Sequence, residues 1–276
     1  MKIEQSVAQH YSHGSLERTI LAALAASGKD IEHLTLADLA PVDEFHIGGR
    51  QATIEFAEQM GLAPGLNLLY IGSGLGGASR YFASERGCRI NGIDLTDEYV
   101  RVAEALARRV GLESRVAYRQ GSALALPFEA GTFDGAYMLH VGMNIPDKER
   151  LFAEIRRVLR PGGVIGIYDV MRQGEGDLTF PLPWASSAGT SFVESADAYR
   201  AMLKGAGFAV EKERSRRESA IEFFRRMRAQ AAQSGGPPPL GLHILMGDSA
   251  QRKAANMSDI LERGLIAPTE IIGRAV

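Results

Sequence analysis

The stretch Asn67-Leu-Leu-Tyr-Ile-Gly-Ser-Gly-Leu-Gly-Gly77 decides the fold of this chain. Leu68–Ile71 is a short apolar run of the kind that forms a strand buried on both faces. The glycines that follow allow the backbone to turn sharply and to lie close against a ligand, because they carry no Cβ. A helix after them would direct its free N–H groups at that ligand. A strand, a glycine loop and a helix in this order predict a nucleotide-type cofactor site.

The glycine spacing alone does not identify the cofactor. Gly72, Gly74 and Gly77 satisfy the G-x-G-x-x-G spacing of dinucleotide-binding enzymes, and a tight strand–helix turn without a ligand would also use them. Asp94 ends the next predicted strand, 22 positions after Gly72. Its carboxylate can accept hydrogen bonds from both ribose hydroxyls of an adenosine-containing cofactor. The alternative is that Asp94 stabilises the N-terminus of the following helix.

Strands and helices alternate with short connections from Leu68 to Val170, which predicts a parallel sheet wrapped by helices. Thr96 and Asp147 are expected to cap two of these helices, and the second is predicted to run through Leu159 and to end at Pro161. A further helix is expected from about Ser195. The predicted strands are Leu68–Ile71, Arg89–Asp94, Ala117–Gln120, Phe133–Leu139, Val164–Val170 and Phe208–Glu213.

The same patterns divide the chain into four parts. We expect an N-terminal helical cap at 1–62, a cofactor-binding core at 63–216, a helical insert at 217–265 and a closing strand at 266–276. Within the cap, a short helix is predicted around Leu34–Leu39, before Pro41. Within the insert, Gly235–Pro239 is expected to separate two helices. Such a cap and insert would exclude water from a small-molecule site.

The composition limits the partners of the protein. The chain has 276 residues, of which 45% are hydrophobic and 23% charged, and these are ordinary values for a globular protein. Its net charge of −2 gives no electrostatic case for a nucleic acid or an acidic membrane as partner. There is no signal-peptide pattern, and no apolar run approaches the roughly 20 residues that span a bilayer. The lone Cys88 suits a reducing compartment.

We therefore expect a cytoplasmic protein that acts on a small molecule, with no nucleic-acid or membrane partner. The oligomeric state stays open, and a homodimer is one of the alternatives. No close group of histidine, cysteine and carboxylate side chains indicates a metal site.

Several motifs, the glycine loop among them, resemble those of the class I S-adenosylmethionine-dependent methyltransferases. The resemblance covers roughly residues 50 to 215, in the order and spacing of that family. Within the family, the chain is similar to the small-molecule branch that contains the ubiquinone/menaquinone-biosynthesis and sarcosine/dimethylglycine methyltransferases. The turn Phe45–Gly49 and the stretch Pro181–Trp184 support this narrower placement. The matching motifs are Leu68–Gly77, Gly92-Ile-Asp-Leu-Thr96, Gln120-Gly-Ser-Ala-Leu-Ala-Leu-Pro-Phe128, Gly131-Thr-Phe-Asp-Gly135 and Val158-Leu-Arg-Pro-Gly-Gly163.

The resemblance implies an α/β, Rossmann-like sheet of seven mostly parallel strands, with helices on both faces. It also implies methyl transfer from S-adenosyl-L-methionine to a nitrogen, oxygen or carbon atom of a small metabolite, by in-line displacement. Asp94 would hold the ribose, and Leu95 would pack on the adenine. The other residues that the resemblance places at the cofactor are Gly72, Ser73 and Gly74 at the methionine part, Ser122 and Ala123 at the adenine edge, and Tyr11, His46, Ile47, Gly48 and His140 around the rest.

Three residues carry the candidate chemistry of the acceptor. His140 would face the reacting methyl group, where an imidazole can act as a general base because it titrates near neutral pH. The alternative is that His140 only forms a wall of the pocket. Tyr11 is a second candidate catalytic residue, with a packing role as its alternative. Trp184 is expected to form a wall of the substrate pocket.

Two positions depart from the family pattern. Tyr70 and Ser122 stand where members of the family usually carry acidic residues. Neither brings a charge, and charge-assisted hydrogen bonds are about twice as strong as neutral ones. A binding protein of the same fold with weak or no catalysis is therefore an alternative. An NAD-dependent oxidoreductase is another, since it shares the glycine spacing, although the later motifs argue against it.

Overall fold

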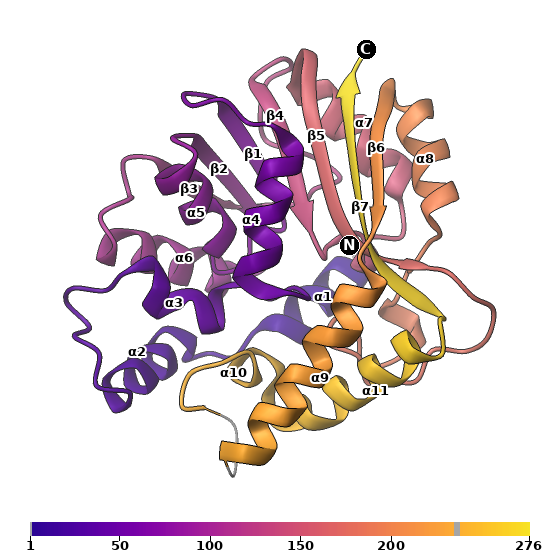
Figure 1. Cartoon of the computed structure of the whole chain (residues 1–276). Helices are drawn as coiled ribbons and strands as arrows, with labels where there is room; N and C mark the ends of the chain where they lie inside the picture. The colour runs from indigo at the N-terminus through magenta and orange to yellow at the C-terminus, as the bar shows by residue number, and fades with distance from the viewer. Residues whose placement is uncertain (1, 235–237) are drawn as a thin grey trace.

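A seven-stranded sheet runs through the centre of the computed structural model, which describes residues 2–234 and 238–276 (Figure 1). The strands are β1 (Asn67–Ile71), β2 (Arg89–Asp94), β3 (Val116–Gln120), β4 (Phe133–Leu139), β5 (Leu159–Arg172), β6 (Phe208–Ser215) and β7 (Ile266–Ala275). Their order in the sheet is β3-β2-β1-β4-β5-β7-β6. β7 pairs antiparallel with both β5 and β6, and the remaining pairs are parallel. The predicted Rossmann-like, mostly parallel sheet is confirmed.

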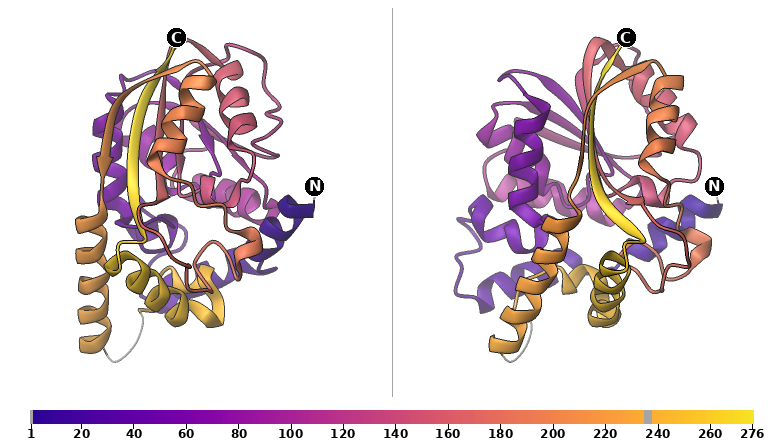
Figure 2. Two further views of the ribbon diagram at one scale, coloured as in Figure 1. Left: turned by 90° about the vertical axis from the view of Figure 1, so that its right-hand side faces the viewer. Right: turned by 45° about the vertical axis from the view of Figure 1, so that its right-hand side comes forward.

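Side chains of β1 alternate between the two faces of the sheet, and both faces are buried. Leu68 and Tyr70 belong to the apolar core on one face, and Leu69 and Ile71 belong to the core on the other. This double burial is what the apolar run of the sequence predicts. The helices of the first face are α4 (Gly49–Met60), α5 (Gly77–Glu85) and α6 (Asp97–Arg109), and those of the second are α7 (Lys148–Val158) and α8 (Ala196–Gly205) (Figure 2).

The remaining helices gather at the carboxyl end of the parallel strands (Figure 1). Leu16, Ile20 and Leu24 of α2 share a buried apolar cluster with Leu240 and Leu245, so the start of the chain packs on a segment near its end. None of the described helices is both long and apolar enough to cross a bilayer. The helices at this end of the sheet are α1 (Lys2–Tyr11), α2 (Leu16–Ala26), α3 (Leu36–Asp43), α9 (Arg217–Ser234), α10 (His243–Met246) and α11 (Ala250–Glu262). The chain also forms the 3₁₀ turns η1 (Gly142–Asn144), η2 (Ala188–Thr190) and η3 (Gly247–Ser249).

Three local predictions differ from the structure or lie beyond it. α3 does not stop before Pro41 but continues to Asp43: a capping box of Thr35 and Asp38 fixes its start, and the burial of Leu39, Val42 and Asp43 offsets the cost of the internal proline. α7 ends at Val158, and Leu159 already pairs with Phe133 in the sheet. Of the break predicted at 235–239, residues 235–237 lie outside the described part of the chain.

Two glycines of the loop after β1 are required by close packing. A Cβ on Gly77 would lie 2.6 Å from the carbonyl oxygen of Asp43, so the start of α5 can approach the end of α3 only without one. A Cβ on Gly72 would lie 2.5 Å from the Val141 side chain. The glycine spacing therefore brings α3 and the segment after β4 against the loop.

We predict that Gly77→Ala destabilises the protein by about 1–3 kcal/mol, because the added methyl group meets backbone and cannot be accommodated by a side-chain rotation. The measurement is the free energy of unfolding in urea. Gly205→Ala in α8 is the matched control, since no atom lies within 4 Å of its added Cβ. Equal unfolding midpoints for the two variants would contradict the packing argument.

Candidate active site

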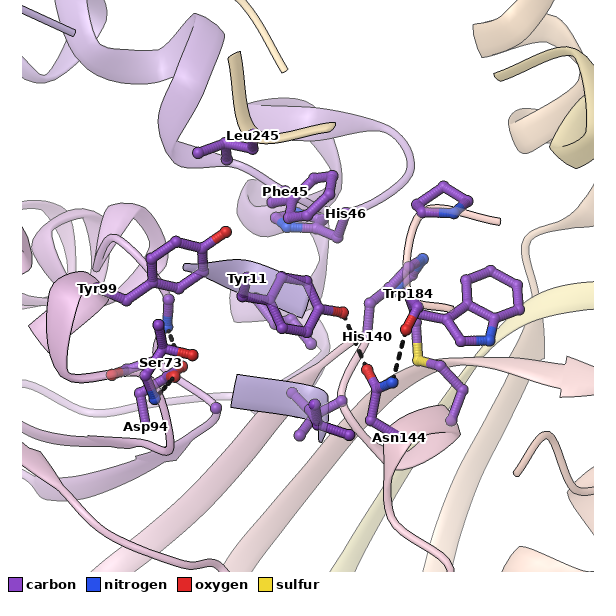
Figure 3. Close-up of a pocket in the computed structure, with 18 of the residues that line it drawn as sticks. Tyr11, Phe45, His46, Ser73, Asp94, Tyr99, His140, Asn144, Trp184 and Leu245 are labelled. Atoms are coloured by element: carbon purple, nitrogen blue, oxygen red, sulfur yellow. Dashed lines mark hydrogen bonds between the residues drawn. The ribbon is translucent and has the colours of Figure 1, made fainter. Parts of the chain in front are cut away.

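A cavity lies at the carboxyl end of the sheet, between the strand-end loops and the helices that cover them (Figure 3). Its volume is about 190 Å³. A single water needs only about 10–15 Å³, so the cavity has room for an organic ligand. One end of the cavity is polar and is built by the loops after β1 and β2. The other end is apolar and is built by α9, α11 and the segment around Trp184.

Asp94 is held rigidly at the polar end. Its Oδ2 accepts a hydrogen bond from the Gly74 amide at 2.8 Å, and its Oδ1 accepts one from the Thr96 amide at 2.9 Å. Burial raises the pKa of Asp94 above its usual value, and the amide hydrogen bonds oppose that shift. Each carboxylate oxygen retains a further lone pair, so a pair of ligand hydroxyls can still donate to this group.

Two hydroxyl groups at the polar end lack partners. The Oγ of Ser73 and the hydroxyl of Tyr99 are buried without a hydrogen bond to any described residue, and both side chains line the cavity. A buried hydroxyl without a partner costs about 1–3 kcal/mol. A ligand rich in hydrogen-bonding groups would remove that cost, so the residues present fit an adenosine-containing cofactor. Tyr99, on α6, had no signal in the sequence that separated it from a core aromatic residue.

The other predicted cofactor residues divide into two sets. Leu95 and Ala123 line the cavity, whereas Ser122 and Gly48 are not among the described residues that do. The Ser122 hydroxyl donates a hydrogen bond to Glu4 of α1 and accepts one from the Leu124 amide. Gly48 caps the start of α4 with a positive φ of 89°. Ser122 thus connects α1 to the loop after β3.

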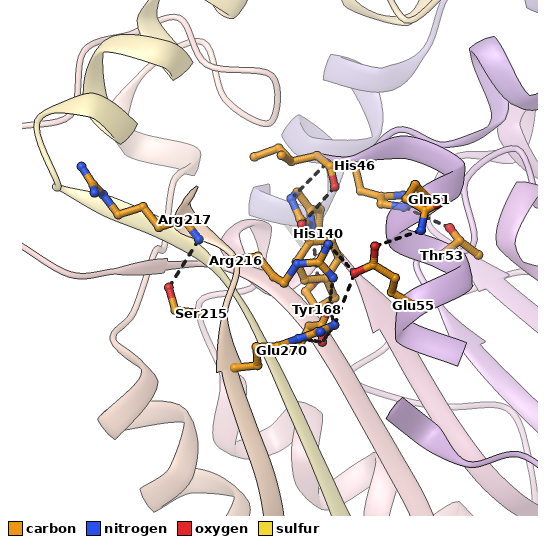
Figure 4. Close-up of polar contacts among 12 residues, drawn as sticks. His46, Gln51, Thr53, Glu55, His140, Tyr168, Ser215, Arg216, Arg217 and Glu270 are labelled. Carbon is orange, nitrogen blue, oxygen red and sulfur yellow. Dashed lines mark hydrogen bonds and ion pairs between the residues drawn. The ribbon is translucent and has the colours of Figure 1, made fainter. Parts of the chain in front are cut away.

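His140 is fastened to the fold through both ring nitrogens (Figure 4). Its Nδ1 donates to the Tyr168 carbonyl oxygen at 3.2 Å, since a carbonyl can only accept, and its Nε2 accepts from the Ile47 amide at 3.4 Å. The Tyr168 hydroxyl in turn donates to the Ile47 carbonyl oxygen at 3.0 Å. Burial lowers the pKa of His140 to about 3, with the nearby His46 contributing. The imidazole is therefore neutral at pH 7.

His46 is also committed to contacts within the fold. The Thr53 hydroxyl donates to Glu44 at 2.7 Å, so its oxygen accepts the 3.1 Å hydrogen bond from Nε2 of His46. Burial lowers the pKa of His46 to about 4. Both His46 and Ile47 line the cavity, and their contact with a cofactor stays a prediction.

An ionic cluster lies close to these histidines on the sheet (Figure 4). Arg216 pairs with Glu270 of β7 at 2.7 Å and with Glu55 of α4 at 2.8 Å. Arg214 pairs with the same two carboxylates. The cluster ties α4, which also carries Thr53, to the two strands at the end of the sheet, β6 and β7.

Tyr11 joins α1 to the wall of the cavity (Figure 3). Its hydroxyl donates to the Oδ1 of Asn144 at 3.0 Å, and the Nδ2 of Asn144 donates to the Trp184 carbonyl oxygen at 2.8 Å. Burial raises the pKa of Tyr11, so this hydroxyl keeps its proton. Trp184 lines the cavity, as predicted, and its indole N–H donates to Ser191. Asn144 of η1 is the junction, and no motif in the sequence pointed to it.

The apolar end of the cavity is lined mainly by the insert. None of the described lining residues is a lysine or an arginine. These insert residues escaped the sequence analysis because phenylalanine, leucine and methionine on helices have the same pattern whether they line a cavity or pack in a core. The insert residues that line the cavity are Phe223, Phe224, Met227, Leu242, Leu245, Met246, Ala254 and Met257.

Comparison with known proteins shows which proteins part of this chain resembles. Residues 69–167 match the model of the methyltransferase domain family. The sterol 24-C-methyltransferase ERG6B of Gibberella zeae is 33% identical over 113 residues, which are 41% of this chain and 30% of that protein. The erythromycin 3''-O-methyltransferase of Saccharopolyspora erythraea is 32% identical over 179 residues, which are 61% of this chain and 58% of that protein. The chain thus spans less than two thirds of the length of these relatives.

A solved structure shows how far the fold similarity extends. The [4+2]-cyclase SpnF superposes with a TM-score of 0.72 at 23% identity, over 99% of this chain and 96% of that one. The fold therefore extends beyond the matched domain. The matched residues contain the glycine loop, Asp94 and His140. Residues 69–167 of this chain thus match a methyltransferase domain, on a fold that is similar to that of SpnF.

Proposed function

We propose that the protein transfers a methyl group from S-adenosylmethionine to a largely apolar small molecule without anionic groups. The observation that carries this proposal is the single cavity with two chemically different ends. Its polar end offers the Asp94 carboxylate and the unpaired hydroxyls of Ser73 and Tyr99. Its apolar end offers aromatic and methionine side chains from α9 and α11.

The charge of the lining argues for the class of acceptor. A phosphate or carboxylate on the acceptor would need cationic partners, because burying an unpaired charge is costly. The described lining supplies neither lysine nor arginine, and burial keeps His46 and His140 neutral at pH 7. The names of two relatives, which refer to sterols and to erythromycin, agree with a large and mainly apolar acceptor. The accepting atom, nitrogen, oxygen or carbon, is not fixed by these arguments.

S-adenosylmethionine supplies a methyl group that is already activated by its sulfonium centre. The protein has to align the acceptor and exclude water. Alignment alone can lower the activation free energy by roughly 7–11 kcal/mol. Asp94 would hold the ribose, and Leu95 and Ala123 would line the adenine site. Tyr11 and Asn144 would keep α1 and the Trp184 loop in place around the acceptor.

The contacts of His140 favour a wall over a general base. Both ring nitrogens already bind backbone groups, and its pKa is lowered to about 3. A backbone φ of 54°, in the left-handed region that is rare for residues other than glycine, shows how tightly the position is determined. We propose that His140 shapes the cavity beside the site of transfer.

The proposed function is tested with binding and turnover. Purified protein is titrated with S-adenosylhomocysteine and with NAD by calorimetry, and is then incubated with S-adenosylmethionine and a sterol, erythromycin or sarcosine. We expect S-adenosylhomocysteine to bind and NAD not to bind, and we expect faster turnover with a sterol or erythromycin than with sarcosine. Failure to bind S-adenosylhomocysteine would overturn the proposal, and turnover with sarcosine alone would overturn the acceptor class.

A single charge at the mouth of the apolar end should weaken acceptor binding. Met227 lines the cavity and is 37% exposed, so Met227→Asp is expected to be tolerated by the fold. Losing about 1 kcal/mol of apolar contact raises KM for the best acceptor of the panel about fivefold. Ala229→Asp adds the same charge to an exposed position of α9 and serves as the control. Equal KM values for the two variants would contradict the assignment of this end to the acceptor.

The proposed role of His140 predicts a flat pH profile. Because its pKa lies near 3, the imidazole stays neutral as the pH rises through its ordinary value, and kcat should show no inflection from His140 between about pH 6 and 8. The profile is measured for the wild type and for His140→Asn. An inflection near pH 6.5 in the wild type that disappears in the variant would show that His140 acts as a base.

A further inference from the structure

A carboxylate beside the glycine loop is only half satisfied. Asp43 is the last residue of α3, and its side chain is fully buried. Its Oδ1 accepts a hydrogen bond from Nη2 of Arg80 at 2.7 Å. Its Oδ2 is buried with no hydrogen-bond partner among the described residues. Asp43 also lines the cavity, so a bound ligand can supply the missing partner.

Arg80 does not complete the pairing. A guanidinium can bind both oxygens of a carboxylate at once. Here Nη1 donates instead to the Ala103 carbonyl oxygen, and Nε has no partner. Burial raises the pKa of Asp43 to about 6, although Arg80 opposes the shift. Most buried polar atoms have a hydrogen-bond partner, because leaving one without a partner is costly, so the Oδ2 of Asp43 requires an explanation.

The position of Asp43 points to one end of the cofactor. Gly77, the last glycine of the loop, packs against the Asp43 backbone, and Gly72, Ser73 and Gly74 line the same cavity. Tyr70, at the end of β1, stacks on the Tyr137 ring at 4.4 Å. Burial raises the pKa of Tyr70, so it stays neutral and offers no charge to this part of the cavity.

We propose that the free oxygen of Asp43 binds the ammonium group of the methionyl part of S-adenosylmethionine. This inference rests on the proposed function. An ammonium group has three N–H donors and a full positive charge. One of these N–H groups would give the Oδ2 of Asp43 the charged hydrogen-bond donor that it lacks among the described residues. The carboxylate that would be expected from β1, where Tyr70 stands, is thereby supplied by α3. Asp43 is in this account a cofactor-binding residue, and Arg80 positions it.

The test compares two ligands that differ at the methionyl end. S-adenosylhomocysteine carries the ammonium group, and 5′-methylthioadenosine lacks the whole amino-acid part. Calorimetry measures the affinity of the wild type, Asp43→Asn and Asp94→Asn for both. We expect Asp43→Asn to weaken S-adenosylhomocysteine roughly 10- to 100-fold, and 5′-methylthioadenosine by less than about twofold, because only the first loses a charged hydrogen bond. Asp94→Asn should weaken both, because both carry the ribose.

The outcomes separate this inference from the proposed function. If the wild type does not bind S-adenosylhomocysteine, the proposed function fails. If the wild type binds it and Asp43→Asn changes the affinity for the two ligands equally, the assignment of Asp43 fails and the proposed function stands.

A second variant covers the case in which Asp43→Asn does not fold. Asp43→Asn combined with Arg80→Met replaces the buried ion pair by neutral groups, an exchange that is often tolerated. The same selective loss of S-adenosylhomocysteine affinity is expected for it, and equal losses for the two ligands would again overturn the assignment.

Discussion

The structure depends on the two hydrogen bonds that clamp Asp94 between consecutive crossovers. One carboxylate oxygen binds the Gly74 amide after β1, and the other binds the Thr96 amide at the start of α6. Parallel strands end at the same edge of the sheet, so this clamp joins the first loop to the second where ligands of such folds bind. The hydroxyls of Ser73 and Tyr99, which have no hydrogen-bond partner among the described residues, lie on the same cavity. The stability of the loops and the fit to an adenosine-containing cofactor therefore depend on the same carboxylate.

The sequence predicted the core of the fold well because its signals are local. Five apolar runs and the glycines between them predict five strands, β1 to β5, and except for β5 the observed bounds differ from the predicted ones by at most one residue. Asp94 could be found because it lies 22 positions after Gly72 in the sequence. The acceptor end could not be predicted in the same way. Phe224 and Met257 lie on helices whose apolar faces look the same over a core or over a cavity. The hydrogen bonds of His140 and the free oxygen of Asp43 depend on contacts with residues far away in sequence, which no motif records.

The cover of the cavity is assembled from opposite ends of the chain. Apolar residues of α2 pack with Leu240 and Leu245, and Tyr11 of α1 binds Asn144 after β4. The methyltransferase-domain match covers the sheet from β1 into β5 and its loops, whereas the helices of the cover lie outside the matched residues.

Four methionines, Met143, Met227, Met246 and Met257, are among the residues that surround the acceptor end. Methionine is unbranched and polarisable, so it adjusts its shape to a neighbour at little energetic cost. A wall of methionine side chains can therefore adapt to acceptors of different shape, which favours directed evolution toward unnatural acceptors. Gains in selectivity would come from replacing these side chains with branched ones, which hold a fixed shape.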